Sequence, residues 1–197
     1  GHSIGAAWAD FNNDGRFDLF AGNFAHVDGR GDQPKSRFLQ GQRTESGWKF
    51  EDRGPAGVFY QESYASPAAA DVDGDGRMDL FFTTVYETAS FNVRNQPTLF
   101  LQTGEWQWQD RTTVTGLEGL PATYQAAWAD FDQDGDTDLF VGTRVKISRY
   151  GYPVNGYLLR NDGKGNFSNV AGSQAPELSK IGMITDAQWL DVDQDGD

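Results

Sequence analysis

Four short acidic segments hold the residues whose types and spacing could do chemistry. They begin at Asp10, Asp71, Asp130 and Asp191, at intervals of 61, 59 and 61 residues. The third, DFDQDGDTD (130–138), has five aspartates among nine residues. Two like charges ~4 Å apart repel by roughly 4 kcal/mol at an effective dielectric of ~20, so a folded chain needs a reason to keep them together. A bound cation would supply that reason.

We call these segments acidic loops 1 to 4 and number each from its first aspartate. Oxygen-bearing side chains recur at positions 1, 3, 5 and 9, and position 6 is always glycine where the chain reaches it. Position 7 can add its backbone carbonyl. Hard oxygen donors around a glycine turn predict calcium, which takes six to eight oxygens, more readily than magnesium. The loops contain no His or Cys, so zinc is not expected. The alternative, an acidic turn without metal, is disfavoured by three loops in the same register.

This numbering defines the predicted ligands. In loop 1 they are Asp10, Asn12, Asp14, Arg16 and Asp18, and in loop 2 they are Asp71, Asp73, Asp75, Arg77 and Asp79. In loop 3 they are Asp130, Asp132, Asp134, Asp136 and Asp138, and in loop 4 they are Asp191, Asp193 and Asp195. About three complete Ca²⁺ sites are therefore expected, with a fourth cut short before position 9. At position 7 only the carbonyl is the expected ligand, and the side chain of Asp136 is expected to point outward.

The loops differ from an EF-hand after position 6. An EF-hand needs Glu at position 12 and flanking helices, whereas position 12 here is Ala21, Phe82 or Val141. Apolar strand-like residues follow position 9 at once. The metal is therefore expected in a β-turn-β loop, which argues against a calcium sensor of the calmodulin kind.

The segments between the loops predict an all-β fold. Each repeat contains four runs of four to eight residues, rich in Phe, Leu, Val and Trp and bounded by Gly, Asn, Asp or Pro. Four antiparallel strands every ~60 residues indicate a β-propeller blade, whereas the alternative β-sandwich requires no fixed period. Small residues in each first strand suit the inner strand near an axis, and Trp8, Trp128 and Trp189 are expected to pack between blades. One helical turn is expected in PELSKIGM (176–183).

We interpret residues 1–197 as part of a propeller, with seven blades expected in the whole. The expected units are blade 1 at about 3–60, blade 2 at about 61–119, blade 3 at about 120–182 and the first strand of blade 4 at about 183–197. A half-propeller that self-associates is the alternative.

The loop motif also resembles a known family. Asp-x-Asp-x-Asp-Gly-x-x-Asp-Leu at this spacing is similar to the FG-GAP/VCBS repeat of integrin α-subunit propellers and many bacterial surface proteins. YLLRNDGKGNFSNVAG (157–172) resembles the ASPIC/UnbV-associated, cartilage acidic protein-like subset. The resemblance implies a calcium-binding propeller, usually extracytoplasmic and often adhesive or ligand-binding. Asn12 departs from the motif, where the family has Asp.

A partner is expected at the end of the blades opposite the acidic loops. In an up-and-down blade, the connections between second and third strands lie at that end, and here they are long and dissimilar, as binding loops on a repeated scaffold are. The third is basic and aromatic, and its candidate ligand-contacting residues are Arg144, Lys146, Arg149, Tyr150 and Tyr152. The alternative is a surface loop packed against its neighbours.

Composition narrows the function further. The net charge of −13 argues against a nucleic-acid partner. No apolar run approaches the ~20 residues of a membrane helix, so membrane insertion is not expected. With two histidines, no cysteine and no nucleophile or phosphate-loop motif, we expect no enzyme activity in this chain.

We therefore expect an extracytoplasmic module, extracellular, at the cell surface or periplasmic, in which calcium is structural and the partner is a protein or a glycan. Calcium modules with Kd of ~10⁻⁴–10⁻³ M work outside the cytosol, which supports that location. The alternative is a non-catalytic propeller in a larger polysaccharide-active enzyme, or a structural subunit of a cell-envelope assembly.

Overall fold

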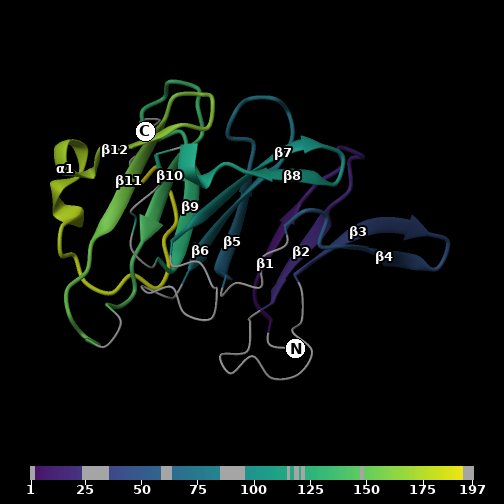
Figure 1. The fold of residues 1–197 in the computed structure, drawn as a ribbon, viewed down its shortest axis with the longest axis horizontal. Helices are drawn as coiled ribbons and strands as arrows, with labels where there is room; N and C mark the ends of the chain where they lie inside the picture. Colours follow the sequence, from purple (N-terminus) through teal and green to yellow (C-terminus); the bar gives the residue numbers. More distant parts are fainter. Residues whose placement is uncertain are drawn as a thin grey trace.

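The computed structural model describes residues 3–23, 36–58, 64–84, 96–114, 116–117, 120, 123–146 and 149–192. Their strands form three four-stranded antiparallel sheets, which stand side by side in Figure 1. The first contains β1 (Ser3–Ala9), β2 (Asp18–Asn23), β3 (Arg37–Thr44) and β4 (Gly47–Gly54). The second contains β5 (Tyr64–Ala70), β6 (Asp79–Thr84), β7 (Thr98–Gly104) and β8 (Gln107–Asp110). The third contains β9 (Gln125–Ala129), β10 (Asp138–Gly142), β11 (Gly156–Asn161) and β12 (Phe167–Asn169).

Each sheet is a propeller blade. The order of the strands in each sheet follows their order in the chain, and all neighbours are antiparallel. The first strands of the blades lie next to one another, β1 beside β5 and β5 beside β9. Their alanine-rich sequences permit this approach because small side chains leave the backbones close together. The predicted all-β, blade-built fold is confirmed, while the number of blades in a closed ring stays a prediction.

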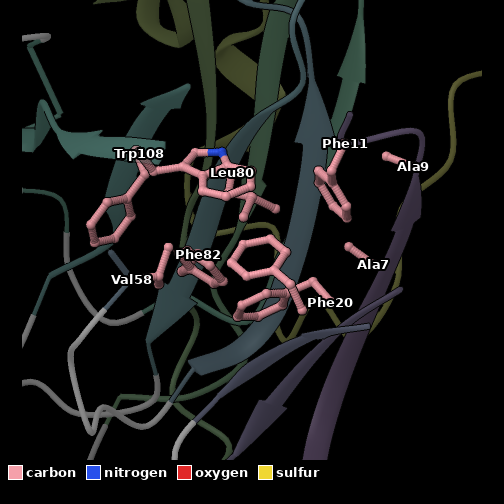
Figure 2. Packing of buried hydrophobic residues seen from close by; sticks show 10 residues of the cluster. Ala7, Ala9, Phe11, Phe20, Val58, Leu80, Phe82 and Trp108 are labelled. Atoms are coloured by element: carbon pink, nitrogen blue, oxygen red, sulfur yellow. The ribbon is translucent and has the colours of Figure 1, made fainter. Parts of the chain in front are cut away.

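The hydrophobic core lies between blades rather than within them. Figure 2 shows the cluster between blades 1 and 2, where Phe20 of β2 faces Phe82 of β6 at a ring-centroid distance of 5.1 Å. Phe38 and Trp108 stack at 4.2 Å across the same interface. A second cluster joins blades 2 and 3 through side chains such as Phe81 and Leu139. Since each fully buried large apolar side chain contributes about 1.5–3 kcal/mol, the blades stabilise one another.

Trp128 and Trp8 were both predicted to pack between blades, and the structure gives them different environments. Trp128 packs between blades 2 and 3, 6.0 Å from Phe81, as predicted. Trp8 is 57% exposed and contacts Phe50 of its own blade, so the prediction is wrong there. The difference has a simple cause, since no described blade covers that side of blade 1.

Residues 183–192 form no strand in the described part of the chain, which corrects the predicted first strand of blade 4. They nevertheless run beside blade 3, because Ile184 N–H donates to Thr143 O at 3.0 Å and Trp189 Nε1–H donates to Ala127 O at 3.2 Å. A strand needs a backbone ladder on at least one side, and these isolated bonds do not form one.

The remaining elements are short. They are η1 (Thr112–Val114), α1 (Ala171–Gln174) and η2 (Pro176–Leu178). The helical turn predicted within 176–183 is confirmed as the 3₁₀ turn η2. In the described segments, no helix is both long and apolar enough to cross a membrane.

Candidate metal centres

Acidic loops 1 to 3 connect the first and second strands of the three blades. Position 1 follows the last residue of the first strand, and position 9 is the first residue of the second strand, for example Asp18 of β2. The antiparallel order places all three loops at the same end of their blades as the turns between third and fourth strands. The long connections between second and third strands lie at the other end.

Two residues of each loop adopt left-handed backbone conformations. Position 6 is Gly15, Gly76 or Gly135, with φ of 79°, 83° and 93°. Position 4 is Asn13, Gly74 or Gln133, with φ of 57°, 71° and 58°. Glycine at position 6 was evident in the sequence, whereas position 4 was missed. Asn and Gly tolerate this conformation and could have signalled it, but Gln133 could not.

The carboxylate at position 1 holds the loop together from within. Its Oδ1 accepts the N–H of position 5, and its Oδ2 accepts the N–H of position 6. In loop 1, the Asp10 carboxylate accepts these bonds at 3.0 and 2.7 Å; the equivalent distances are 3.1 and 2.8 Å in loop 2, and 3.1 and 3.0 Å in loop 3. The position-5 carboxylate likewise accepts the N–H of position 7 in all three loops. The loops are therefore folded by their own acidic groups.

The aspartate at position 9 is fully buried in all three loops. One oxygen accepts the N–H of position 2, at 2.9 to 3.3 Å. The other accepts a backbone N–H from the third strand: that of Gly41 for Asp18, Gln102 for Asp79 and Asn161 for Asp138, at 2.7–2.8 Å. The sequence predicted this residue as a ligand only. The structure adds that it joins three parts of its blade, and each carboxylate oxygen retains a lone pair for a metal.

The predicted ligands converge in loops 2 and 3. Oxygen atoms of positions 1, 3 and 9 lie within 4.8 Å of one another in two groups, Asp71–Asp73–Asp79 and Asp130–Asp132–Asp138. Loop 1 differs by having the amide of Asn12 at position 3. The Oδ1 atoms of Asn12 and Asp73 are buried and accept no hydrogen bond from the described residues. Buried oxygens without donors normally cost free energy, and a cation would satisfy them.

The electrostatics of the clusters also fit a cation. Burial, together with the neighbouring carboxylates, raises the pKa of Asp79 to about 7 and that of Asp138 to about 6. Burial and the Asp75 carboxylate raise the pKa of Asp73 in the same direction. All these shifts disfavour the charged form, and a dication beside the carboxylates would reverse them. The residues present therefore fit a hard cation held by oxygen.

Arginine at position 7 does more than offer its carbonyl. Arg16 forms an ion pair with Asp14 at 2.5 Å, and Arg77 forms one with Asp75. The Nε–H of each arginine donates to a carbonyl of the third strand, Gly41 O at 3.2 Å in the case of Arg16. We call this arrangement the arginine clasp. Sequence reasoning missed it, although an arginine two residues after an aspartate was a usable signal.

Loop 3 has no clasp, because position 7 is Asp136. Its carboxylate lies against the β11–β12 turn, so close to Gly163 that a Cβ there would come 2.5 Å from Oδ1. The side chain of Asp136 therefore packs against this turn and is not in the cluster of Asp130, Asp132 and Asp138, and its role as a carbonyl ligand stays a prediction. Desolvation and the carboxylates of Asp134, Asp130 and Asp162 raise the pKa of Asp136. Within the described ranges, no ion pair to an arginine or lysine involves loop 3.

Loop 4 is only partly within the described residues. Asp191 is exposed, and Asp193 and Asp195 lie outside the described residues. The prediction for these three positions stays a prediction.

The candidate ligand loop lies at the opposite end, between β10 and β11. Its cations stack on aromatic rings of the same blade: Arg144 lies 4.7 Å from the Tyr124 ring centroid, and Lys146 and Arg149 lie 5.9 and 6.0 Å from that of Tyr152. Tyr150 and Tyr152 are exposed. Lys146 and Arg149 thus lie together at Tyr152, whereas Arg144 lies at Tyr124. The other long connections, residues 25–35 and 86–95, lie outside the described residues.

Comparison with known protein families found a match to one part of the chain. A family described as FG-GAP-like repeat matches residues 85–141, which include β7, β8, β9, acidic loop 3 and the start of β10. Residues 85–141 are therefore similar to one FG-GAP-like repeat, and they run from the second blade into the third. A search of curated proteins found no match.

Proposed function

We propose that this chain is a calcium-binding β-propeller module in which calcium is structural. The convergence of three carboxylates within 4.8 Å, repeated in loops 2 and 3, carries the proposal. Two further observations support it, namely the buried Oδ1 atoms of Asn12 and Asp73 without donors and the identical internal hydrogen bonds of all three loops. Positions 1, 3, 5 and 9 and the position-7 carbonyl would hold the ion.

A structural role is favoured over a catalytic one by the burial of the carboxylates. Asp79 and Asp138 have raised pKa values, which catalytic acids also have. Both are fully buried, however, and both of their oxygens accept backbone N–H groups. A substrate could not reach them without opening the blade. The ion would instead tie the first two strands to the third and remove repulsion among the carboxylates.

We place the proposed partner, a protein or a glycan, at the opposite end of the blades. The exposed Tyr150 and Tyr152 and the stacked cations support this assignment, since rigid aromatic and arginine side chains are frequent binding determinants. An extracytoplasmic location follows from the proposal, because calcium modules of ordinary affinity fill only where calcium is abundant. We also propose, from the resemblance of residues 157–172, that the chain belongs to the ASPIC/UnbV-associated subset of this repeat.

Thermal unfolding of the demetallated chain with and without calcium tests the metal claim. Binding to the folded state alone should add about 2.7 kcal/mol for each independent site at a calcium concentration of a hundred times Kd, so the Tm should rise. Magnesium at equal concentration should have a smaller effect. Asp132→Asn should reduce the gain, whereas Glu177→Gln, an exposed acid outside the loops, should leave it unchanged. Equal Tm values in calcium and in chelator would refute the proposal.

A further inference from the structure

The third strands of blades 2 and 3 each carry a buried side-chain amide beside the acidic loops. Gln102 in β7 and Asn161 in β11 occupy equivalent places, because the backbone N–H of each donates to the position-9 aspartate of its own blade. Blade 1 has Gly41 at this place, where a Cβ would come 2.2 Å from Phe17 O, and so has no such amide.

Both amides reach back to the loop of the preceding blade. The Nε2–H of Gln102 donates to Phe11 O, and the Nδ2–H of Asn161 donates to Val72 O, each at 2.7 Å. Phe11 and Val72 are the position-2 residues of loops 1 and 2, and each is only 1% exposed. These bonds span 91 and 89 residues of sequence. Each amide therefore joins its own acidic loop to the previous one.

The accepted carbonyl is the one that precedes position 3. Because the peptide group is planar, fixing the carbonyl of position 2 also fixes the N–H and the backbone direction of position 3. Position 3 in these two loops is Asn12 or Asp73, the residues whose buried Oδ1 atoms lack a donor.

Loop 3 provides the contrast. No described amide reaches its position-2 carbonyl. There Phe131 is only half-buried, and Asp132 at position 3 is exposed.

We propose that Gln102 and Asn161 are positioning residues for the calcium site of the preceding blade. Neither touches the ion. Each orients the position-3 ligand of the loop before it, so the sites of loops 1 and 2 are complete only when the next blade is docked. This inference rests on the proposed calcium function. It predicts that a substitution in one blade weakens calcium binding in its neighbour.

Site-resolved calcium titration by ¹H–¹⁵N NMR tests this inference. The amides of Gly15, Gly76 and Gly135 each donate to the position-1 aspartate of one loop, so their signals report the three sites separately. Gln102→Leu removes the amide and keeps the backbone N–H. It should raise the calcium concentration at the Gly15 midpoint about tenfold, which corresponds to ~1.4 kcal/mol, near the upper end for one hydrogen bond.

The pattern across sites separates positioning from general damage. Asn161→Leu should move the Gly76 midpoint more than that of Gly135, which it also affects because Asn161 Nδ2–H donates to Thr137 O of loop 3 at 3.0 Å. Gln102→Leu should move the Gly135 midpoint no more than twofold, and the control Gln109→Leu, an exposed amide in β8, should move none. An unchanged Gly15 midpoint in Gln102→Leu, or equal shifts at all three glycines, would overturn the inference. If calcium moved none of the three glycine signals in the wild-type protein, the proposed function would be refuted instead.

The wild-type protein supplies a test that does not depend on the folding of a variant. The side-chain amide signals of Gln102 should move at the same calcium concentration as Gly15. Movement with Gly76 alone would overturn the inference.

Discussion

Acidic loops 1 and 2 share their backbone with loop 3 but balance their charge differently. The first two contain an arginine clasp at position 7, whereas loop 3 has Asp136 there and no described cationic partner. A clasped loop therefore keeps one positive charge of its own beside position 5. In loop 3 no described cationic side chain balances the negative charge of the aspartates, so solvent cations or a bound metal must balance it. The comparison suggests that one loop conformation can carry sites of different calcium dependence.

Loops 1 and 2 also differ from loop 3 in how deeply the position-2 residue is buried. The next blade covers the position-2 residues Phe11 and Val72 almost completely, while Phe131 of loop 3 remains half-buried. Local sequence sets the loop conformation, because hydrogen bonds within the loop recur in all three copies. Neighbouring blades set the dielectric around the ligands. A substitution that changes the charge or the burial of one loop should therefore change its calcium affinity or the stability of the chain without changing the fold.

The largest expected effect lies at position 9, which both kinds of loop share. Asp79→Ala leaves two buried N–H groups without an acceptor, and should lower the free energy of unfolding by roughly 2–5 kcal/mol in calcium. Asp138→Ala should behave similarly in loop 3. Asp73→Ala is the matched control, since it removes a ligand that is not bonded to the third strand as Asp79 is, and chemical denaturation in chelator should leave it close to wild type. Equal losses for Asp79→Ala and Asp73→Ala in chelator would show that position 9 has no scaffold role.

The pH dependence of the metal-free protein should distinguish loop 2 from loop 3. The folded-state pKa values of Asp79 and Asp138 are raised from 3.8 to about 7 and about 6, so their contribution to stability is present at low pH and lost as pH rises through those values. Unfolding in calcium-free buffer should therefore become easier from about pH 4 to pH 8. Asp138→Asn should flatten the lower part of this curve and Asp79→Asn the upper part. Stability that rises over this range would contradict the assignment.

Exchange of position 7 should convert one kind of loop into the other. Asp136→Arg should weaken calcium binding at loop 3 about tenfold at low salt, because two units of charge change beside a dication. Arg77→Asp should strengthen binding at loop 2 while destabilising the metal-free chain. Calorimetric titration measures both, with Asp136→Asn expected to show about half the effect. If Asp136→Arg bound calcium with wild-type affinity, the arginine clasp would not explain a difference in calcium affinity between the loops.

The smallest effect is expected from exchange at position 3. Asn12→Asp should strengthen calcium binding at loop 1 several-fold, since a carboxylate replaces an amide. It should also lower stability without calcium, because the 2.9 Å bond from Asn12 Nδ2–H to Asp14 becomes a repulsion. Asp132→Asn should show the opposite changes in loop 3, by calcium titration and by denaturation in chelator. Changes of the same sign in both loops would rule out a simple charge effect.

The sequence predicted what local patterns and their repetition determine. Strand-forming runs, glycine at position 6 and carboxylates at fixed spacing were enough to predict the blades and the candidate ligands. The amides of Gln102 and Asn161 were beyond reach, because they act on residues about 90 positions earlier in the chain. The orientation of Asp136 depends in the same way on the distant turn at Gly163. Trp8 was misassigned because its burial depends on a neighbouring blade, not on its own strand.

A crystal structure of the chain grown in calcium would test the central claim most directly. We expect one ion in each of loops 1 to 3, bound by positions 1, 3, 5 and 9 and the position-7 carbonyl at about 2.3–2.6 Å. The Oδ1 atoms of Asn12 and Asp73 should be among the ligands. Ordered water in place of an ion in all three loops, at calcium concentrations well above the millimolar range, would contradict the account.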